Sequence, residues 1–241
     1  DIGIIGFGRF GKLITKYLAE NCKVYVSSRS NKEKEIRAVN CIPSALEEAC
    51  GKDIIIPSVP ISEFEATLKK IKKLLKKNSI IIDVCSVKEY PAEAMKRILP
   101  KNVQILATHP MFGPDSAAES LQGRKIVLCR VRIKNNKYEI IKKYLQEKGL
   151  VIVEATPENH DREIAKSLVL THFIGRALIE FGAAERDIDT QGYKRIMEIL
   201  NTVKNDTWQL FEDMNRYNKY SKKMRHDFIA ALNIVNRRLE K

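Results

Sequence analysis

The sequence predicts an α/β protein in two parts, a parallel sheet covered by helices and then an all-helical region. Three observations lead to this prediction. Short apolar runs alternate with amphipathic segments over residues 1–154, a glycine-rich turn follows the first run, and strand-like runs stop after Glu154. Such alternation is typical of a parallel sheet with helices on both faces. We therefore expect one domain over residues 1–154 and a helical domain over residues 155–241.

The apolar runs of the first domain predict its strands. They cover Ile2–Ile5, Val24–Ser27, Asp53–Ile56, Ile80–Val84, Val103–Ala107, Ile126–Leu128 and Val151–Val153. Apolar residues at helical spacing predict helices between these strands, such as those through Phe10–Leu18, Phe64–Leu75 and Ile140–Leu145. Residues 31–50 predict no firm strand.

The second domain opens with a helix-start signal at Thr156–Glu158, which supplies an N-cap, a proline suited to the first turn and an early acid. The helical pattern runs from there to about Phe181 without a breaker. Apolar stripes through Tyr193–Val203 and Phe228–Leu239 predict further helices. A region of this size cannot bury such stripes by itself, so we expect a homodimer that forms through residues 155–241.

Composition excludes several classes of protein. The chain has 241 residues, with 43 Lys and Arg against 30 Asp and Glu and a net charge of +13. Much of this charge lies in residues 68–77, where the lysines fall opposite an apolar helix face and no aromatic residues interleave with them. We therefore expect a solvated surface and no nucleic-acid binding. No apolar run approaches a membrane span, no leader-like segment is recognisable, and the five cysteines are isolated. These features predict a cytoplasmic protein with no membrane association and no bound metal.

A glycine-rich turn, Gly6-Phe-Gly-Arg-Phe-Gly11, follows the first strand and opens the first helix. In this context Gly6 suits a tight turn, Gly8 lets the backbone approach a pyrophosphate, and Gly11 permits close packing of helix on strand. The helix N-terminus then faces the anion. The pattern predicts a Rossmann-type dinucleotide-binding domain, with Arg9 and Phe10 among the cofactor contacts. A purely structural glycine turn is the alternative.

Polar and basic residues follow the second strand. An NAD site usually has an acid there to bind the ribose 2′-hydroxyl, but none occurs before Glu33. Ser28, Arg29 and Ser30 could instead bind a 2′-phosphate through two hydroxyls and a guanidinium group. We therefore expect NADP as the cofactor, with NAD as the other candidate. An ordinary polar turn is the alternative interpretation.

Three polar residues, Ser58, Ser86 and His109, each lie just past the carboxyl end of an expected strand. Open α/β sheets bind ligands at this edge. Pro110 biases His109 toward an extended backbone, which fixes its presentation. We expect His109 to act in the reaction, with a structural histidine as the alternative. The expected cofactor contacts at this edge are Ser58, Val59 and Pro60.

Thr108-His-Pro-Met-Phe-Gly-Pro-Asp115 closely resembles the signature of the prephenate and arogenate dehydrogenases, oxidoreductases of tyrosine biosynthesis. Residues 83–88 resemble their second motif, and residues 160–161 with 171–172 resemble the helix that enters their dimerisation domain. The resemblance covers nearly the whole chain in order. The segments most similar to the arogenate branch are residues 189–193 and 201–218.

The resemblance implies a reaction and the roles of several residues. Prephenate would lose hydride from C4 to the nicotinamide, its hydroxyl proton and its ring carboxylate, giving 4-hydroxyphenylpyruvate and carbon dioxide. His109, in its neutral form, would be the catalytic group that accepts the hydrogen bond of the hydroxyl. Ser86 would contact the same hydroxyl or orient the imidazole. Lys88 would bring positive charge near a substrate carboxylate, unless it is an exposed loop lysine.

Helical periodicity places Asp161, Leu168 and His172 on one stripe of the long helix. A stripe with an acid and a histidine can face a substrate, so we expect His172 to bind it. The alternative is a helix-start acid with a hydrogen-bonded core histidine. His160 lies well off this stripe, and we expect it to be a helix-end contact.

One position departs from the family. Many prephenate-specific members carry a carboxylate-binding arginine near the position of Asn201. Another cation would then bind the substrate carboxylate, or the preferred substrate differs. The candidates for that cation are Arg195, Lys204 and Arg216.

Three other functions stay open at this point. Arogenate is the alternative substrate, and Asp115 and Glu119 are candidates for binding its ammonium group. A general NADP-dependent oxidoreductase would not need the element from His109 to Pro114. A non-enzymatic dinucleotide sensor would tolerate the loss of His109.

Overall fold

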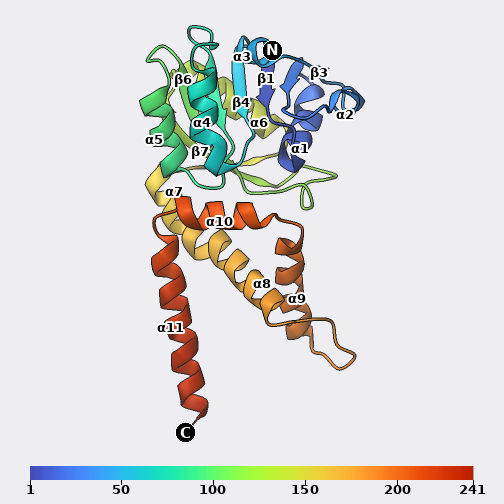
Figure 1. Cartoon of the computed structure of the whole chain (residues 1–241), viewed down its shortest axis with the longest axis vertical. Coiled ribbons are helices and arrows are strands. Elements are labelled where there is room, and N and C mark those ends of the chain that lie inside the picture. Colours follow the sequence, from blue (N-terminus) through green and yellow to red (C-terminus); the bar gives the residue numbers. More distant parts are fainter. Residues whose placement is uncertain (241) are drawn as a thin grey trace. The chain divides into compact units, whose positions relative to one another are not determined.

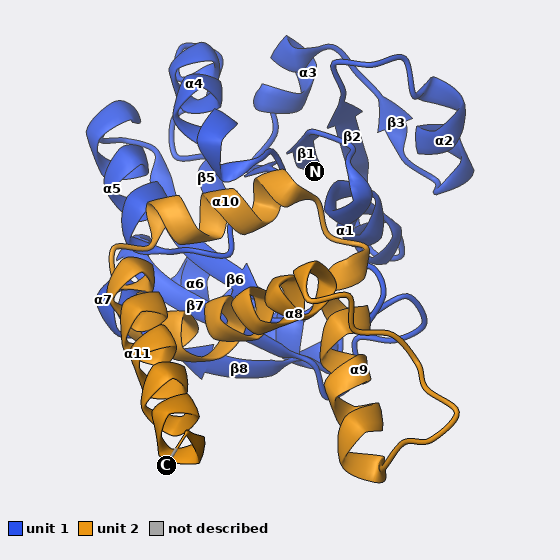
Figure 2. Cartoon of the chain, turned by 60° about the horizontal axis from the view of Figure 1, so that its bottom comes forward, with its two compact units in different colours: residues 1–160 blue, residues 161–241 orange. Residues whose placement is uncertain are grey.

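A computed structural model of the chain describes residues 1–240 (Figure 1). The chain divides into two compact units, residues 1–160 and a second unit that begins at Asp161, coloured blue and orange in Figure 2. The boundary predicted after Glu154 precedes helix α7 (Pro157–Ile164), whereas the two units divide within that helix.

Unit 1 contains one eight-stranded sheet with the strand order β3-β2-β1-β4-β5-β6-β7-β8. Starting from β1, the chain builds outward to β3 on one side, then crosses back to β4 on the other side of β1. This reversal is the switch point at which doubly wound sheets bind ligands. The strands are β1 (Ile2–Ile5), β2 (Val24–Ser27), β3 (Ile42–Pro43), β4 (Ile54–Pro57), β5 (Ile80–Asp83), β6 (Gln104–Pro110), β7 (Lys125–Arg132) and β8 (Val151–Glu154).

The predicted parallel sheet is confirmed, with one antiparallel pair of strands that the sequence did not predict. Strand β7 runs antiparallel to β6, whereas β8 is again parallel to β7. Residues 111–124 join β6 to β7 without a crossover helix, and a direct return of this kind brings neighbouring strands into antiparallel pairing.

This pairing also lengthens both strands beyond the predicted ranges. His109 pairs with Val127 and Pro110 with Ile126, so β6 continues to Pro110. His109 therefore lies within the strand near its carboxyl end, not past it as the sequence suggested. Residues 31–50, which predicted no firm strand, contain only the two-residue β3 between short helices.

Helices cover both faces of the sheet. Leu13, Ile36 and Tyr138, from α1, α2 and α6, belong to one buried cluster with alternate strand residues such as Ile4 and Leu106. The intervening strand residues face the other side, where α4 and α5 lie opposite α6 (Figure 1). The helices of this unit before α7 are α1 (Arg9–Ala19), α2 (Glu33–Ala38), α3 (Leu46–Cys50), α4 (Ile61–Ile71), α5 (Glu89–Ile98) and α6 (Asn135–Glu147).

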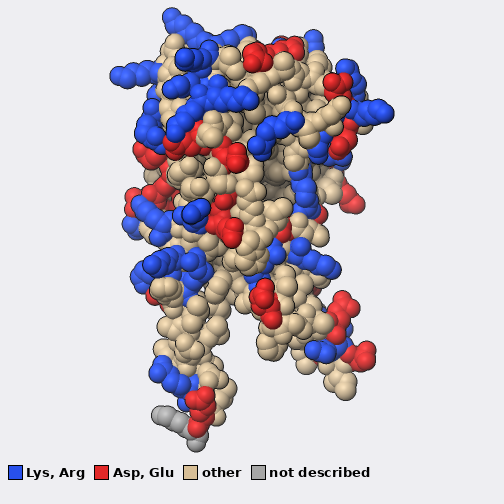
Figure 3. Space-filling view, viewed as in Figure 1, with Lys and Arg blue, Asp and Glu red and all other residues tan. Residues whose placement is uncertain are grey.

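Helix α4 has the amphipathic pattern that the sequence predicts. Phe64, Leu68 and Ile71 are fully buried, and the lysines between and after them are exposed. The helix ends at Ile71, earlier than predicted, because the Leu74 N–H donates to the Ile71 carbonyl in a tight turn that leads toward β5. Acidic side chains lie among the basic ones over the visible face of the molecule (Figure 3).

Within the described residues of unit 2, the regular secondary structure is helical, and loops such as residues 181–190 join the helices. Thr156 caps α7 as predicted, because its Oγ1 accepts a hydrogen bond from the Asn159 N–H at 3.2 Å. The stretch from Pro157 to Glu180 is not one uniform α-helix, since a π-helical turn covers Ala165–Val169. The helices that follow this turn are α8 (Leu170–Glu180), α9 (Gln191–Lys204), α10 (Trp208–Tyr217) and α11 (Ser221–Leu239).

Close packing of α8 on α9 depends on Gly175. A Cβ atom at this position would lie 2.5 Å from Cγ2 of Val203. On another side of α8, the ring of Phe173 meets that of Phe228 from α11 edge-on, with centroids 6.4 Å apart. Among the helices that the structure describes, none has both the length and the apolar composition that a bilayer span requires.

Candidate active site

The glycine-rich turn lies at the switch point of the sheet, between β1 and α1. Gly6 has a φ of 101°, a conformation that favours glycine. A Cβ atom on Gly6 would lie 2.2 Å from the Ser58 carbonyl oxygen, and one on Gly11 would lie 2.5 Å from the Gly6 carbonyl oxygen. The Ser58 N–H donates to the Ile5 carbonyl at 2.7 Å. The turns after β1 and β4 are therefore packed backbone against backbone.

The N-terminus of α1 suits an anionic ligand. Gly8 is the N-cap residue, so no side chain caps the helix, and the first turn contains no acidic residue. A Cβ atom on Gly8 would meet nothing within 4 Å. The first-turn N–H groups thus adjoin open space, which is the arrangement that a dinucleotide pyrophosphate requires. The residues present fit the predicted cofactor.

The segment after His109 is held against α1. Arg9 donates two hydrogen bonds to the Asp115 carboxylate, at 2.8 and 3.0 Å, and Tyr17 donates to the Ala117 carbonyl at 2.7 Å. The rings of Phe10 and Phe112 lie 6.4 Å apart. Arg9, predicted to contact the cofactor, therefore has a carboxylate partner. Asp115, a sequence candidate for binding an ammonium group, already has the guanidinium group of Arg9 as its partner.

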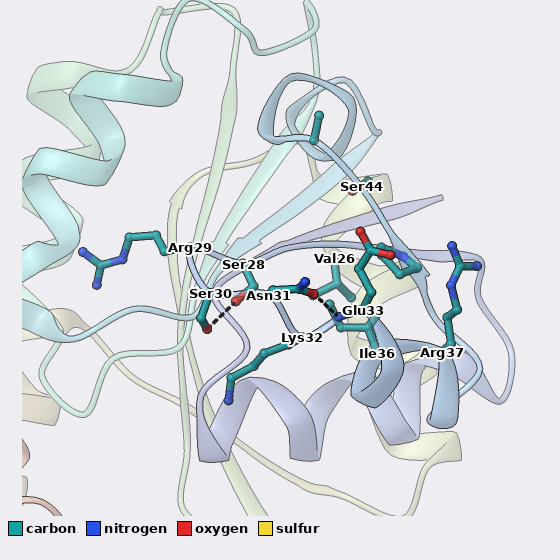
Figure 4. Close-up of a pocket in the computed structure, with 12 residues that line it drawn as sticks. Val26, Ser28, Arg29, Ser30, Asn31, Lys32, Glu33, Ile36, Arg37 and Ser44 are labelled. Carbon is teal, nitrogen blue, oxygen red and sulfur yellow. Dashed lines mark hydrogen bonds between the residues drawn. The ribbon is translucent and has the colours of Figure 1, made fainter.

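A cavity of about 370 Å³ lies beside the turn after β2 (Figure 4). The hydroxyls of Ser28 and Ser30 lie 3.4 Å apart at its edge, and Lys32 also lines it. Arg29 extends away from the two serines (Figure 4), with its side chain 82% exposed and its Nη1 3.7 Å from a Glu63 carboxylate oxygen. The turn therefore brings the two predicted hydroxyls together but directs the guanidinium group outward.

The most distinctive feature of unit 1 is a pair of buried histidines. His109 on β6 and His160 on α7 are 5% and 3% exposed. Nδ1 of His109 lies 2.8 Å from Nε2 of His160, and the two rings meet edge-on. His160, expected to be a helix-end contact, lies in the first turn of α7 and pairs there with His109. The two residues are 51 positions apart, so no local pattern could have revealed this pairing.

Burial holds the pKa of His109 well below the usual value for histidine, and the positive charges that His160 and Lys88 can carry lower this pKa further. The imidazole is therefore neutral at ordinary pH. Within residues 1–240, the His109 side chain forms its hydrogen bond with His160, and it does so through Nδ1. Nε2 is consequently the nitrogen that can serve a ligand.

Lys88 and Asp83 form an ion pair in which neither side chain is exposed. The Lys88 ammonium group also donates to the Thr108 carbonyl, next to His109. The Asp83 carboxylate accepts hydrogen bonds from the N–H groups of Cys85 and Thr108, at 3.0 and 3.2 Å. The alternative of an exposed loop lysine is wrong, and the ammonium group already has a carboxylate partner within the protein.

Ser86 lies between Asp83 and Lys88 in the loop after β5. Its hydroxyl oxygen is buried and has no hydrogen-bond partner among residues 1–240. The structure thus shows no hydrogen bond through which Ser86 would orient the imidazole. Because β5 and β6 are adjacent and parallel, with Asp83 opposite Ala107, Ser86 and His109 belong to the same edge of the sheet.

In unit 2, His172 is 4% exposed, and its Nε2 lies 3.7 Å from the Asp206 carboxylate. Burial, together with the Arg176 charge, lowers the pKa of His172 to about 4. Nδ1 of His172 and Nε of Arg176 are buried without hydrogen-bond partners among the described residues. The guanidinium group of Arg176 donates to the Asp206 carbonyl. These atoms leave unused donor capacity in a buried setting.

The stripe predicted through Asp161, Leu168 and His172 assumed uniform α-helical periodicity. The π-helical turn interrupts that periodicity, although Asp161 and His172 are both buried. The three cations that the sequence offered as substitutes at Asn201 all have exposed side chains. They are Arg195, Lys204 and Arg216. Arg176 was not predicted from the sequence. Its position one helical turn after His172 could have indicated that the two side chains share one face of the helix.

The doubly wound sheet with a glycine-rich turn at its switch point defines unit 1 as a Rossmann-type nucleotide-binding domain, and a helical region follows it. Residues 14–154 match the family model described as prephenate dehydrogenase, nucleotide-binding domain. Residues 177–241 match a model described as TYRAAT1-like, C-terminal domain. The chain belongs to the prephenate/arogenate dehydrogenase family.

Individual relatives agree with this assignment. Arogenate dehydrogenase 2, chloroplastic, of Arabidopsis thaliana is 31% identical over 230 residues, which cover 90% of this chain and 63% of the relative. A probable arogenate/prephenate dehydrogenase of Methanocaldococcus jannaschii is 29% identical, with 95% of this chain and 54% of the relative covered. The chain therefore spans less than two thirds of the length of these curated relatives.

Two solved structures share the fold. Prephenate dehydrogenase from A. aeolicus, in complex with hydroxyphenyl propionate and NAD+, has a TM-score of 0.76 and 22% identity, with 99% of this chain and 91% of that chain covered. Arogenate dehydrogenase from Synechocystis has a TM-score of 0.74 and 23% identity, with the same coverage.

Proposed function

We propose that this chain is the dehydrogenase that converts prephenate to 4-hydroxyphenylpyruvate and carbon dioxide, with NAD(P) as the hydride acceptor. The observation that carries the proposal is His109, a buried and neutral imidazole whose Nε2 is left for a ligand. It lies at the carboxyl edge of the sheet, where doubly wound proteins bind their substrates. Membership in the prephenate/arogenate dehydrogenase family supports the same reaction.

The cofactor, when bound, supplies the hydride acceptor for C4 of the substrate. We assign its pyrophosphate to the N-terminus of α1, where Gly6, Gly8 and Gly11 leave the backbone accessible. We assign its 2′-phosphate to the turn after β2, which favours NADP because no acid precedes Glu33 there. The remaining proposed contacts are Arg9, Phe10, Ser28, Arg29, Ser30, Ser58, Val59 and Pro60.

His109 has two tasks in the proposed reaction. Its Nε2 accepts the hydrogen bond of the substrate hydroxyl and takes the proton as the C4 hydride leaves. Loss of carbon dioxide then restores the aromatic ring, and the proton returns to the phenolate oxygen. Ser86, whose buried hydroxyl has no partner among residues 1–240, can add a second hydrogen bond to the same oxygen.

Prephenate carries two carboxylates that the protein must bind. We assign one carboxylate to His172 and Arg176. Nδ1 of His172 and the Nε–H donor of Arg176 are both buried and have no hydrogen-bond partner in the described chain. Lys88, proposed from the sequence for a carboxylate, is committed to Asp83. We therefore assign Lys88 a supporting role behind His109 and no direct contact with the substrate.

Arogenate is the second candidate substrate, since the Arabidopsis and Synechocystis relatives are named arogenate dehydrogenases. It differs from prephenate in bearing an ammonium group on its side chain. Steady-state turnover of both substrates with NAD+ and with NADP+ tests the proposal. We expect prephenate with NADP+ to give the highest kcat/KM. A clear preference for arogenate would reassign the substrate, and no turnover of either would reject the activity.

We also propose that the helical region forms a homodimer. Helix α11 exposes a series of large apolar side chains that a monomer would leave in water. A second copy of the chain would cover such a surface with an isologous contact. The large apolar residues that α11 exposes are Ile229, Leu232, Ile234, Val235 and Leu239.

A further inference from the structure

We infer that His160 is a positioning residue for His109, one that fixes which ring nitrogen carries the proton and shares the charge of the protonated base. This inference rests on the proposed function and deepens it. The two imidazoles are 2.8 Å apart at Nδ1 and Nε2 and are both almost fully buried. In such a setting water cannot replace one ring as the partner of the other.

The tautomers of the two rings are linked. A hydrogen bond between two imidazole nitrogens needs one N–H group and one lone pair. If His109 accepts at Nδ1, its neutral ring carries the proton on Nε2 and cannot act there as a base. If His109 donates from Nδ1, its Nε2 has the lone pair that the substrate hydroxyl requires. The productive arrangement therefore makes Nε2 of His160 the acceptor, with the proton of His160 on Nδ1.

The same contact acts when the proton moves. The O–H bond of the substrate breaks, an Nε2–H bond forms on His109, and the ring becomes an imidazolium. Its Nδ1–H then donates to a neutral His160, so the positive charge is stabilised by a charge-assisted hydrogen bond. This is the task that a carboxylate performs behind the histidine of a hydrolase triad. The proton returns to the phenolate oxygen afterwards, and His160 ends in its original state.

The surroundings of His109 explain why a neutral partner suits this position. The charged and titratable groups that face His109 are His160 from α7 and Lys88, which is itself paired with Asp83. The ammonium group of Lys88 disfavours protonation of His109. The lone pair of His160 offsets this effect when the substrate proton is transferred to His109. The two histidines thus set how readily the base accepts a proton and how readily it returns it.

The test replaces His160 with alanine and with glutamine and measures kcat across pH. We expect His160→Ala to lower kcat by about 10- to 100-fold, less than the loss of the base itself, with cofactor Kd unchanged. The acidic limb of its rate profile should move to higher pH, because water that enters the emptied space relieves the desolvation that lowers the pKa of His109. His160→Gln should recover part of the rate, since its Oε1 can accept from Nδ1 of His109. The control is His226→Ala, which alters an exposed histidine of α11.

A double-mutant cycle separates positioning from a merely structural role. In a His109→Ala background, His160→Ala should cause no further loss of kcat. A loss that persists in full there, or wild-type rate and pH profile in both His160 variants, would overturn the inference. If His160→Ala fails to fold, His160→Gln provides the same cycle.

Nitrogen NMR of labelled histidines gives a readout that does not depend on turnover. In the wild-type protein, the His109 signals should show Nδ1 protonated and Nε2 unprotonated, and this preference should weaken in His160→Ala and persist in part in His160→Gln. A wild-type His109 protonated on Nε2 would overturn the inference. Failure of the wild-type protein to turn over either substrate would instead reject the proposed function, and the NMR result would still decide the pairing.

Discussion

The ammonium group of Lys88 and the carboxylate of Asp83 form an ion pair that is closed to solvent and joins the end of β5 to the start of α5. The pair also reaches β6, because Lys88 donates to the Thr108 carbonyl and Asp83 accepts from the Thr108 N–H. Thr108 in turn donates from its hydroxyl to the Asp83 carbonyl at 2.6 Å. Through these bonds the loop that carries Ser86 and the strand that carries His109 are held as one piece.

Removing one member of this pair should destabilise unit 1 strongly. Lys88→Met keeps the length of the side chain but leaves the Asp83 carboxylate buried without a cation. We expect the free energy of unfolding to fall by about 3–5 kcal/mol, as measured with guanidinium chloride. The control is Lys223→Met, which breaks an exposed ion pair with Asp227 and should cost less than about 1 kcal/mol. Equal effects of the two substitutions would show that the buried pair contributes no more to the free energy of unfolding than an exposed pair does.

Unit 2 should lose stability in mild acid because of His172. Its pKa is about 4 in the folded protein and about 6.5 in the unfolded chain, so the unfolded state binds more protons between these values. This contribution is fully present above pH 6.5 and is lost as the pH falls toward 4, by about 3 kcal/mol in total. His172→Gln should show a correspondingly shallower dependence of unfolding free energy on pH, and His226→Gln should not. Identical slopes for wild type and His172→Gln would contradict the assignment.

The turn after β2 should determine the choice of cofactor. If Arg29 binds the 2′-phosphate, Arg29→Ala should weaken NADP binding by about 1.5–3 kcal/mol and leave NAD binding almost unchanged. Arg29 is free to swing toward the phosphate because its side chain is exposed and its carboxylate neighbour, Glu63, is 3.7 Å away. Titration of each cofactor by fluorescence measures both constants. Equal losses for the two cofactors would mean that Arg29 only shapes the turn.

The helical region should hold two copies together. Multi-angle light scattering at micromolar concentration should give twice the chain mass of 27.6 kDa. Leu232→Glu on α11 places a charge in the proposed interface and should yield monomers, because a buried unpaired charge is costly. Lys222→Glu, at an exposed position on the same helix, is the matched control. A wild-type protein that stays monomeric at this concentration would reject the dimer.

Local patterns were enough to predict much of the fold. The bounds of β1 and β2 agree with the sequence, because each is a short apolar run between polar residues. The turn conformation of Gly6 follows from its place directly after β1. The direction of β7 could not be predicted, since it depends on which neighbour the strand pairs with and not on its own residues.

The site was predictable where one residue carries the signal and hidden where two distant residues share it. His109 stands out from its position at the end of a strand and before Pro110. Its partner His160 lies 51 positions away, and helical phase argued against a role for it. The burial of Lys88 was equally hidden, because lysine in a loop is ordinarily exposed and only the tertiary placement of Asp83 reverses that expectation.

The central claim is that the neutral imidazole of His109 is the base of the reaction, and one measurement tests it most directly. That measurement is kcat for prephenate in His109→Ala and His109→Asn across pH, with cofactor Kd determined alongside. A positioned base typically contributes about 10²–10⁴-fold, so both variants should be slower by that factor while cofactor binding stays unchanged. Because burial lowers the pKa of His109, the wild-type rate should stay level through pH 6.5 and fall only at more acidic pH. That acidic limb should be absent from both variants. A His109→Ala protein with the wild-type rate, or one that keeps the acidic limb, would contradict the account.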